Sequence, residues 1–280
     1  MSRYKLLAMD IDGTLVDSRA EFRPAAREAL RRAVDAGLRV VLCTGRRYRT
    51  AVPIAQEAGI ALPIICHSGA LVKNTATHAT VYAQPLAGET LELLMASLAD
   101  FGLTPLAFTD TYEHGTDFYV ERDATLTRYH EDYLVKNAGW YAAVGSLRRD
   151  LPAPVIQVCT FGELNELRER QAQLRQRLGG LTTCHLLHSA KYLGNFLEFQ
   201  SGSASKWAAL CSLLDSYGIA PDEVVAIGDD ENDISMLRAA GLGVAMGNAA
   251  PAVKSAAHVV APSNDDDGVA RVIDKLLQDA

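Results

Sequence analysis

Two aspartates separated by one residue stand near the amino terminus, at the end of an apolar segment. Asp10 and Asp12 lie in the sequence DIDGT at 10–14, and residues 5–11 predict a buried strand. Side chains two positions apart on an extended backbone point the same way. Such a pair suits nucleophilic attack, proton transfer or metal binding. An isolated pair, however, more often hydrogen-bonds the backbone of a turn.

Polar residues also follow other predicted strands. Thr44, Gly45 and Arg46 stand at the carboxyl end of the strand predicted at 38–44, and GDDEND at 228–233 stands at the end of the one predicted at 223–228. In a parallel sheet, ligands bind outside the carboxyl ends of the strands, so these clusters are expected to converge. Lys206 begins a predicted helix, where amide groups favour an anion. Taken without the other clusters, Thr44 would be interpreted as an ordinary helix cap and Lys206 as a solvated surface lysine.

Four carboxylates brought together in this way would repel one another strongly. They are Asp10, Asp12, Asp229 and Asp233. A divalent cation relieves this repulsion, and hard oxygen ligands favour Mg²⁺, which also takes a substrate phosphate. The sequence therefore predicts a magnesium site beside an anion site.

The elements that must position these residues alternate along both ends of the chain. Apolar runs predict strands at 5–11, 38–44, 62–67, 223–228, 242–246 and 258–261. Helical periodicity predicts helices at 24–36, 49–58, 205–217, 232–240 and 269–277. Strands that are apolar on both faces and joined by helices favour a parallel sheet between helices, an α/β fold of Rossmann-like type.

The middle of the chain differs in pattern. Residues 84–200 hold most of the aromatic residues, a helix predicted at 163–178, and strand-like runs such as 155–160 and 195–199. We expect an inserted α+β domain here, and a core domain made of 1–83 and 201–280. Both flanks have linker composition and are candidate hinges.

Composition excludes several classes of protein. The chain has 280 residues, 49% of them hydrophobic, and a formal net charge of −7. It offers no basic patch for nucleic acid and no apolar run long enough to span a membrane. Five widely spaced cysteines favour reduced thiols over disulfides or a zinc site. We expect a cytoplasmic protein, a monomer or a weak homo-oligomer.

The polar clusters, taken in order, resemble the four motifs of the haloacid dehalogenase-like (HAD) phosphohydrolases. The motifs are DIDGT at 10–14, TGR at 44–46, Lys206 and GDDEND at 228–233. The insertion resembles the large α+β cap, of C2 type, of the Cof-type subfamily. VAMGNA at 244–249 and NDDDGV at 264–269 are similar to that subfamily's tail signatures. One departure occurs after the third predicted strand, where His67-Ser68 stands in place of the usual Asn before Gly69-Ala70.

The resemblance implies a role for each candidate residue. Asp10 is similar to the nucleophile that forms an aspartyl-phosphate, and Asp12 to the general acid and base. Mg²⁺ would be held by Asp10, the backbone carbonyl of Asp12 and Asp229, with Asp233 and Asn232 positioning ligands or water. The phosphoryl oxygens would be bound by Thr44, Gly45 and Lys206, and Arg46 and Asn232 are further candidates for binding the substrate.

The expected function is a Mg²⁺-dependent phosphatase of small phosphate esters, either sugar phosphates or phosphorylated cofactors. Two alternatives remain: a phosphomutase, and a non-catalytic binding protein on the same fold. Candidates for substrate specificity, by charge and proximity to the hinge, are Arg46, His185, His188, Lys191 and Asn195.

Overall fold

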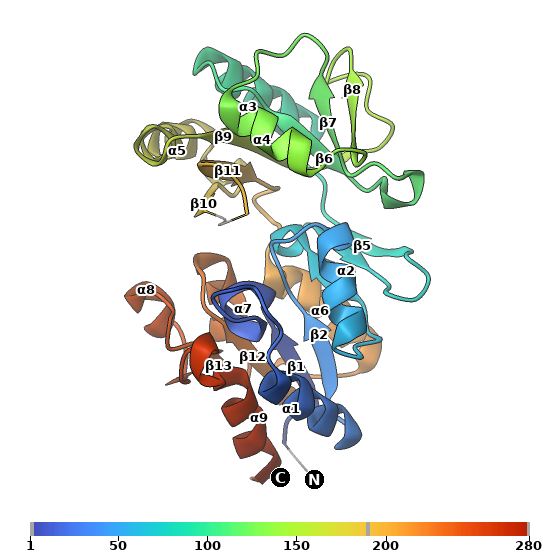
Figure 1. Cartoon of the computed structure of the whole chain (residues 1–280), viewed down its shortest axis with the longest axis vertical. Helices are drawn as coiled ribbons and strands as arrows, with labels where there is room; N and C mark the ends of the chain where they lie inside the picture. Colours follow the sequence, from blue (N-terminus) through green and yellow to red (C-terminus); the bar gives the residue numbers. More distant parts are fainter. Residues whose placement is uncertain (1–2, 189–190, 279–280) are drawn as a thin grey trace. The chain divides into compact units, whose positions relative to one another are not determined.

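The computed structural model describes residues 3–188 and 191–278 of the chain. Its internal packing divides the chain into two compact units (Figure 1). The first unit comprises the residues up to Tyr82 and from Ser205 onwards, and the second unit is Ala83–Ala204.

A five-stranded sheet forms the centre of the first unit, and its strands follow the order β14-β13-β12-β1-β2. All neighbouring strands of this sheet run parallel. Their bounds are β1 (Leu6–Met9), β2 (Arg39–Leu42), β12 (Val224–Gly228), β13 (Leu242–Ala245) and β14 (Val259–Val260). The predicted parallel sheet is therefore confirmed.

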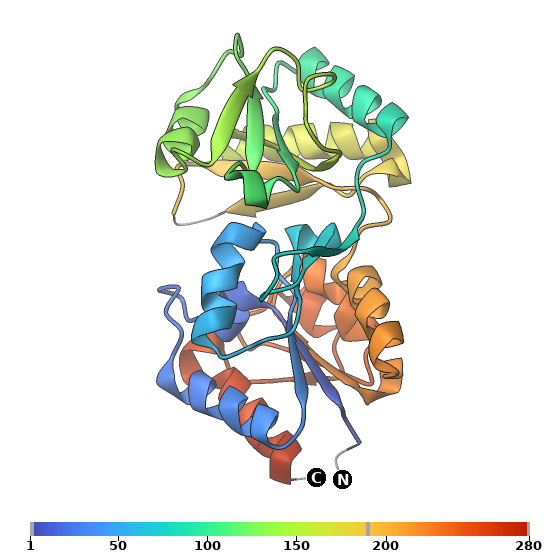
Figure 2. The same cartoon turned by 90° about the vertical axis from the view of Figure 1, so that its right-hand side faces the viewer.

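Helices cover both faces of this sheet, as Figure 2 shows. They are α1 (Pro24–Asp35), α2 (Tyr48–Glu57), α6 (Lys206–Tyr217), α7 (Ile234–Ala239), α8 (Pro251–Lys254) and α9 (Gly268–Gln278). Leu210 of α6 and Met236 of α7 pack with Leu6, Ala8 and Ala226 of the sheet in one buried cluster. Because strand side chains alternate between faces, Leu7 and Met9 face the other side, where α1 and α9 lie side by side (Figure 1).

The third strand departs from the prediction. Residues 62–67 were expected to extend the parallel sheet, but β3 (Ile64–Cys66) pairs antiparallel with β4 (Leu71–Lys73). These two strands and β5 (Thr80–Ala83) make a separate three-stranded sheet. The cause is a tight turn over His67–Gly69, which reverses the chain. Contact with the main sheet remains as a parallel bridge between Cys43 and Ile65.

Short turns follow β1 and β12 at the carboxyl edge of the main sheet. After β1 the chain forms a turn over Ile11–Leu15, in which Gly13 has a φ of 73°. After β12 a 3₁₀ turn over Glu231–Asp233 precedes α7, so the helix predicted at 232–240 is shorter than expected. The first amide of this turn, that of Glu231, has no backbone acceptor within the turn. It donates instead to the side chain of Asp230, the residue that caps the turn.

The second unit combines a mixed sheet with helices, which is the α+β architecture predicted for the insertion. Its six strands follow the order β10-β11-β9-β6-β7-β8, antiparallel except for the β7–β8 pair. The strands are β6 (Leu106–Thr109), β7 (Phe118–Glu121), β8 (Tyr141–Val144), β9 (Val155–Gly162), β10 (His185–His188) and β11 (Asn195–Phe199). Its helices are α3 (Gly88–Asp100), α4 (Arg128–Lys136) and α5 (Leu164–Leu178).

The second unit has its own hydrophobic core. Leu94 of α3 and Leu174 of α5 are buried together with Val158 and Leu197 of the sheet. On α4, Tyr133 packs against Phe161 at a ring-centroid distance of 4.7 Å. Burial of this kind is the main favourable term in holding a unit together.

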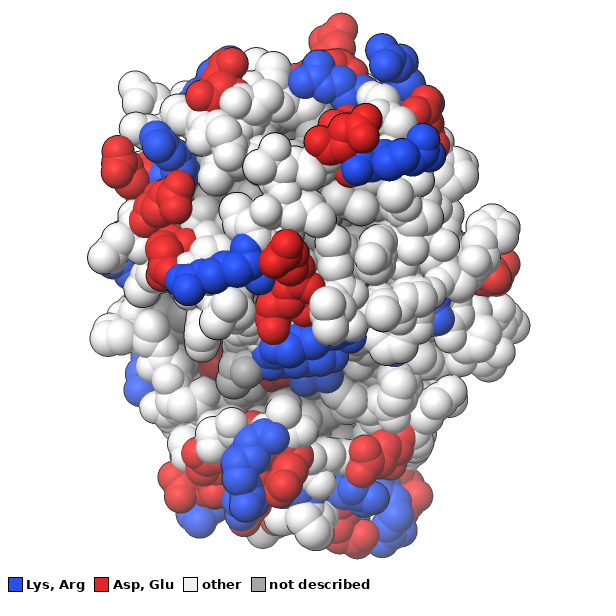
Figure 3. Space-filling model, turned by 45° about the horizontal axis from the view of Figure 1, so that its top comes forward, with Lys and Arg blue, Asp and Glu red and all other residues white. Residues whose placement is uncertain are grey.

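Surface charge agrees with the composition. On the face seen in Figure 3, Lys and Arg side chains alternate with Asp and Glu and form no extended basic patch. Of the helices that the structure describes, none combines the length and apolar character needed to cross a bilayer.

Candidate active site

Asp10 and Asp229 lie at the same edge of the parallel sheet because their strands are neighbours in register. Met9, the last residue of β1, is opposite Ile227 of β12, and the amide of Asp10 donates a hydrogen bond to the Ile227 carbonyl oxygen. Each aspartate therefore follows the carboxyl end of its own strand, where open α/β sheets bind ligands. The side chain of Asp10 is buried.

Three carboxylates meet at this edge. Oxygen atoms of Asp10, Asp229 and Asp233 all lie within 4.8 Å of one another. Lys206 joins two of them, since its Nζ donates to Asp10 Oδ1 at 2.7 Å and to Asp233 Oδ1 at 2.6 Å. Its side chain has no exposed surface. Lys206 and three of the four predicted carboxylates thus form one cluster, which is buried except for the partly exposed Asp229.

The electrostatics of the cluster show an excess of negative charge. Burial raises the pKa of Asp10 well above its usual value, an effect that Lys206 opposes and the neighbouring aspartates reinforce. Burial also raises the pKa of Asp229 to about 7, despite the hydrogen bond from Thr14. For Lys206, burial lowers the pKa, but the charges and hydrogen bonds of Asp10 and Asp233 outweigh burial and raise it above its usual value.

Asp229 is held from two sides. Thr14 Oγ1 donates to its Oδ1 at 2.7 Å, and Asn248 Nδ2 donates to its Oδ2 at 3.2 Å. The backbone of Gly13 lies against the Asp229 carboxylate, and a methyl group at Gly13 would be only 2.1 Å from Asp229 Oδ2. Thr14 and Asn248 were not among the predicted site residues, although both lie inside segments that carried the family resemblance.

Asp233 is held just as firmly. Its Oδ2 accepts hydrogen bonds from the backbone amides of Asp229 at 2.9 Å and Asp230 at 3.0 Å. With Lys206 on Oδ1, the carboxylate organises the loop that carries Asp229. This arrangement fits a residue that positions the others.

Asp12 lies apart from the three-carboxylate cluster. Its side chain is 56% exposed and forms an ion pair with Arg46. Arg46 Nε donates to Asp12 Oδ2 at 2.6 Å, and Nη2 donates to Oδ1 at 2.5 Å. Arg46, a candidate for binding the substrate, is therefore bound to Asp12 in this structure.

Thr44 and Gly45 lie at the end of β2, beside the next loop of the core. Thr44 is fully buried, and its Oγ1 accepts a hydrogen bond from the Arg46 amide. Asn232 Nδ2 donates to Ser68 Oγ at 3.1 Å. A methyl group at Gly45 would lie 3.6 Å from Asn232 Nδ2, so the predicted phosphate-binding loop and Asn232 are neighbours.

The residues present fit a hard divalent cation. The donor set consists of carboxylate oxygens, which Mg²⁺ prefers, without thiolates or imidazoles. One ammonium group pairs with two of the three carboxylates, and a metal cation would favour the ionised forms that burial disfavours.

The remaining specificity candidates belong to the second unit. His185 lies on β10, Asn195 on β11, and His188 Nδ1 is 3.2 Å from the Gly194 carbonyl oxygen. The Lys191 ammonium lies over the ring of Tyr192. His185, His188 and Asn195 thus belong to the antiparallel pair β10–β11.

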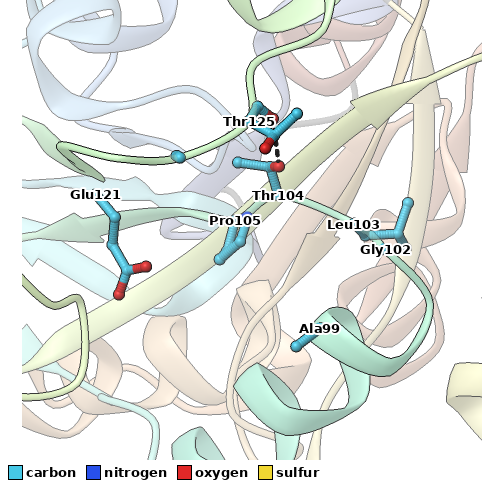
Figure 4. Close-up of a pocket in the computed structure, with 8 residues that line it drawn as sticks. Ala99, Gly102, Leu103, Thr104, Pro105, Glu121 and Thr125 are labelled. Carbon is cyan, nitrogen blue, oxygen red and sulfur yellow. Dashed lines mark hydrogen bonds between the residues drawn. The ribbon is translucent and has the colours of Figure 1, made fainter.

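A pocket of about 280 Å³ also occurs within the second unit (Figure 4). Thr104 Oγ1 donates to the Thr125 carbonyl oxygen at its wall. Its one carboxylate, Glu121, already accepts a hydrogen bond from the Leu147 amide. This lining brings no catalytic group together.

Comparison with known proteins identifies the family to which the chain belongs. A family model described as haloacid dehalogenase-like hydrolase matches residues 7–273. The 5-amino-6-(5-phospho-D-ribitylamino)uracil phosphatase YwtE of Bacillus subtilis (strain 168) is 30% identical, and the alignment covers 98% of each chain. The pyridoxal phosphate phosphatase YbhA of Escherichia coli (strain K12) is 27% identical over 96% of this chain and 97% of its own.

A solved structure gives the same result. The crystal structure of a haloacid dehalogenase-like hydrolase from Bacteroides thetaiotaomicron is 31% identical, with a TM-score of 0.77. The match covers 98% of this chain and 99% of the other. The chain belongs to the haloacid dehalogenase-like hydrolase family and is a phosphatase of that family.

Proposed function

We propose that this protein is a Mg²⁺-dependent phosphatase of small phosphate esters and that it works through an aspartyl-phosphate on Asp10. The observation that supports this most is the buried cluster in which Lys206 Nζ bonds both Asp10 and Asp233, with Asp229 beside them. Phosphoryl transfer needs a positioned nucleophile and positive charge close to the phosphoryl group. Asp10 can supply the nucleophile, and Lys206 and a metal ion bound by the carboxylates can supply the charge.

In the first step, Asp10 attacks phosphorus in line with the leaving oxygen. A bond forms between a carboxylate oxygen of Asp10 and phosphorus, and the bond from phosphorus to the leaving oxygen breaks. Asp12 gives its proton to that oxygen, which departs as an alcohol. Asp12 is suited to this exchange because it is two residues from Asp10 and its side chain is exposed.

In the second step, water releases the phosphoryl group. Asp12, now ionised, takes a proton from a water molecule whose oxygen bonds to phosphorus, and the bond to Asp10 breaks. Lys206 and the hydroxyl of Thr44 bind phosphoryl oxygens throughout. Mg²⁺ held by Asp10, Asp229 and the carbonyl of Asp12 would neutralise charge on the phosphoryl group, while Asp233 and Asn232 would fix the surroundings.

The substrate class we propose is sugar phosphates or phosphorylated cofactors. The two relatives support it, since one is named for a phosphoribityl compound and the other for pyridoxal phosphate. We also propose that 84–200 acts as a cap that selects the leaving group, on a core of 1–83 and 201–280.

A phosphate-release screen over phosphate esters, with Mg²⁺ or with EDTA, tests the proposal. We expect release from several small esters with Mg²⁺, and its loss with EDTA and in Asp10→Asn. Conversion of a sugar phosphate to its isomer without free phosphate would instead indicate a phosphomutase. Absence of any turnover would indicate a binding protein.

A further inference from the structure

The turn between β3 and β4 holds two non-glycine residues in the left-handed region of backbone space. His67 has a φ of 49° and Ser68 a φ of 53°, and Gly69 follows at 103°. Residues other than glycine, asparagine and aspartate rarely adopt this conformation, and each such residue raises the free energy of the folded state. The side chains of His67 and Ser68 are both buried.

Packing against α6 holds the turn in this conformation. A methyl group at Gly69 would lie 2.1 Å from the Ser205 carbonyl oxygen and 2.7 Å from the Lys206 amide nitrogen. The amide of Ser68 donates to the Thr44 carbonyl oxygen at 3.0 Å. Ser68 is thus fixed between the start of the helix that carries Lys206 and the residue that follows β2.

The Ser68 hydroxyl lies beside the proposed phosphate-binding loop. A methyl group at Gly45 would be 3.4 Å from Ser68 Oγ and 3.6 Å from Asn232 Nδ2. Ser68 Oγ accepts the hydrogen bond from Asn232 Nδ2 at 3.1 Å. Ser68, Gly45 and Asn232 therefore form a small polar surface next to Thr44.

Two polar groups in this surface, the hydroxyl hydrogen of Ser68 and the side-chain oxygen of Asn232, have no hydrogen-bond partner among the described residues. A hydroxyl group has one hydrogen to donate, and throughout 3–188 and 191–278 no acceptor for the hydrogen of Ser68 is found. Asn232 Oδ1 is likewise buried without a partner in that part of the chain. An acceptor atom of a ligand can take the hydrogen of Ser68, whereas Asn232 Oδ1 is itself an acceptor and needs a donor, such as water.

We propose that Ser68 donates its hydroxyl hydrogen to a non-bridging oxygen of the substrate's phosphoryl group, and that Asn232 orients the hydroxyl. This assignment rests on the proposed phosphatase function. It adds a neutral donor to the contacts from Thr44, Gly45 and Lys206. It also gives a reason for a serine in a backbone conformation that glycine or asparagine would adopt at lower cost.

Three substitutions distinguish the effect of the Ser68 hydroxyl from the effect of the positive φ at this position. Ser68→Ala removes the hydroxyl and keeps the unfavourable φ, whereas Ser68→Gly removes the hydroxyl and relieves the φ. Ser68→Asn relieves the φ and supplies an amide donor. Ala20→Gly is the matched control, because Ala20 has a φ of 60° on an exposed loop.

The readouts are the affinity for inorganic phosphate with Mg²⁺, kcat/KM for 4-nitrophenyl phosphate, and the melting temperature. We expect Ser68→Ala and Ser68→Gly to lose about tenfold or more in both phosphate affinity and kcat/KM, by similar factors. Ser68→Gly should melt at a higher temperature than the wild type in spite of that loss. Ser68→Asn should recover part of the affinity, and Ala20→Gly should change only the melting temperature.

Wild-type affinity and kcat/KM in Ser68→Ala would overturn the assignment. A loss in Ser68→Ala that Ser68→Gly restores would also overturn it, because the backbone and not the hydroxyl would then be responsible. If the wild type binds phosphate but hydrolyses no ester, the phosphatase proposal fails while phosphate affinity still decides the role of Ser68. If the wild type neither binds phosphate nor turns over, both fail.

Discussion

Arg46 binds both carboxylate oxygens of Asp12, through Nε at 2.6 Å and Nη2 at 2.5 Å. The other terminal nitrogen of Arg46, Nη1, lies 3.5 Å from the Thr50 carbonyl oxygen in α2, so the guanidinium is anchored on both sides. A two-point contact fixes the orientation of a carboxylate better than a single bond does. When Asp12 carries the proton on one oxygen, Arg46 can keep only the contact to the other oxygen, and that contact still positions the proposed acid and base although its side chain is half exposed.

Loss of this pair should affect poor leaving groups most. An alkyl alcohol needs a proton in order to leave, whereas 4-nitrophenolate leaves without one. Because general acid catalysis contributes roughly 10²- to 10⁴-fold, Arg46→Ala should lower kcat/KM, which reports the step in which the alcohol leaves, by about ten- to a hundredfold for alkyl phosphates and by much less for 4-nitrophenyl phosphate. Asp12→Asn provides the reference for complete loss. Equal loss on both substrates would indicate that Arg46 binds the substrate and does not orient Asp12.

Lys206→Met should destabilise the protein when no metal is bound. It would leave the carboxylates of Asp10 and Asp233 buried without their cation, and breaking such a pair typically costs about 3–5 kcal/mol. Urea unfolding in EDTA measures this cost, and Mg²⁺ should offset part of it. Arg31→Met, which breaks only exposed pairs with Glu28 and Asp35, is the control and should lose less than about 1 kcal/mol.

Gly13→Ala should weaken the response to Mg²⁺. The new methyl group would meet Asp229 Oδ2 at 2.1 Å and displace that carboxylate. Gly115→Ala is the matched control, because Gly115 has a φ of 76°, close to the 73° of Gly13, but has nothing within 4 Å. Both variants should lose about 1 kcal/mol of stability from the positive φ. Only Gly13→Ala should lose the rise in melting temperature that Mg²⁺ gives, and an equal rise in both variants would exclude Asp229 as a ligand.

Glu198 should make stability fall as the pH rises. Burial raises the pKa of this carboxyl to about 7, although hydrogen bonds from Gln157 and Gln200 oppose the shift. The folded state therefore holds the proton more tightly than the unfolded state, and the associated stability is lost between about pH 4.5 and pH 7.

Glu198→Gln removes this dependence. At pH 8 the variant should be more stable than the wild type, by at most about 3 kcal/mol. At pH 4.5 or below the difference should be small, and urea unfolding at both pH values measures it. Glu113→Gln, at an exposed position, should show no such change. A pH-independent difference for Glu198→Gln would mean that the carboxyl does not titrate in this range.

The sequence predicted the parallel sheet and three members of the acidic cluster for a physical reason, whereas Asp12, which was also expected in the cluster, lies apart from it. Strands apolar on both faces have few alternatives to a covered parallel sheet. Residues at the carboxyl ends of such strands then meet at one edge, as Asp10 and Asp229 do.

Other features depended on contacts that no periodicity encodes. The antiparallel turn after β3 is held by Gly69 against the Ser205 carbonyl oxygen, which lies far away in the sequence. The support of Asp229 by Thr14 and Asn248 likewise comes from two distant loops. The pair between Arg46 and Asp12 required side-chain geometry, since charge alone was equally consistent with Arg46 binding a phosphate.

Chemical trapping of the enzyme during turnover tests the central claim most directly. Borohydride reduces an acyl phosphate to an alcohol, so Asp10 should become homoserine when substrate and Mg²⁺ are both present. Peptide mass spectrometry then locates the change. We predict homoserine at position 10, and its absence when either substrate or Mg²⁺ is omitted. Reduction at another carboxylate, or an unmodified Asp10 in an enzyme that is turning over, would contradict the proposed mechanism.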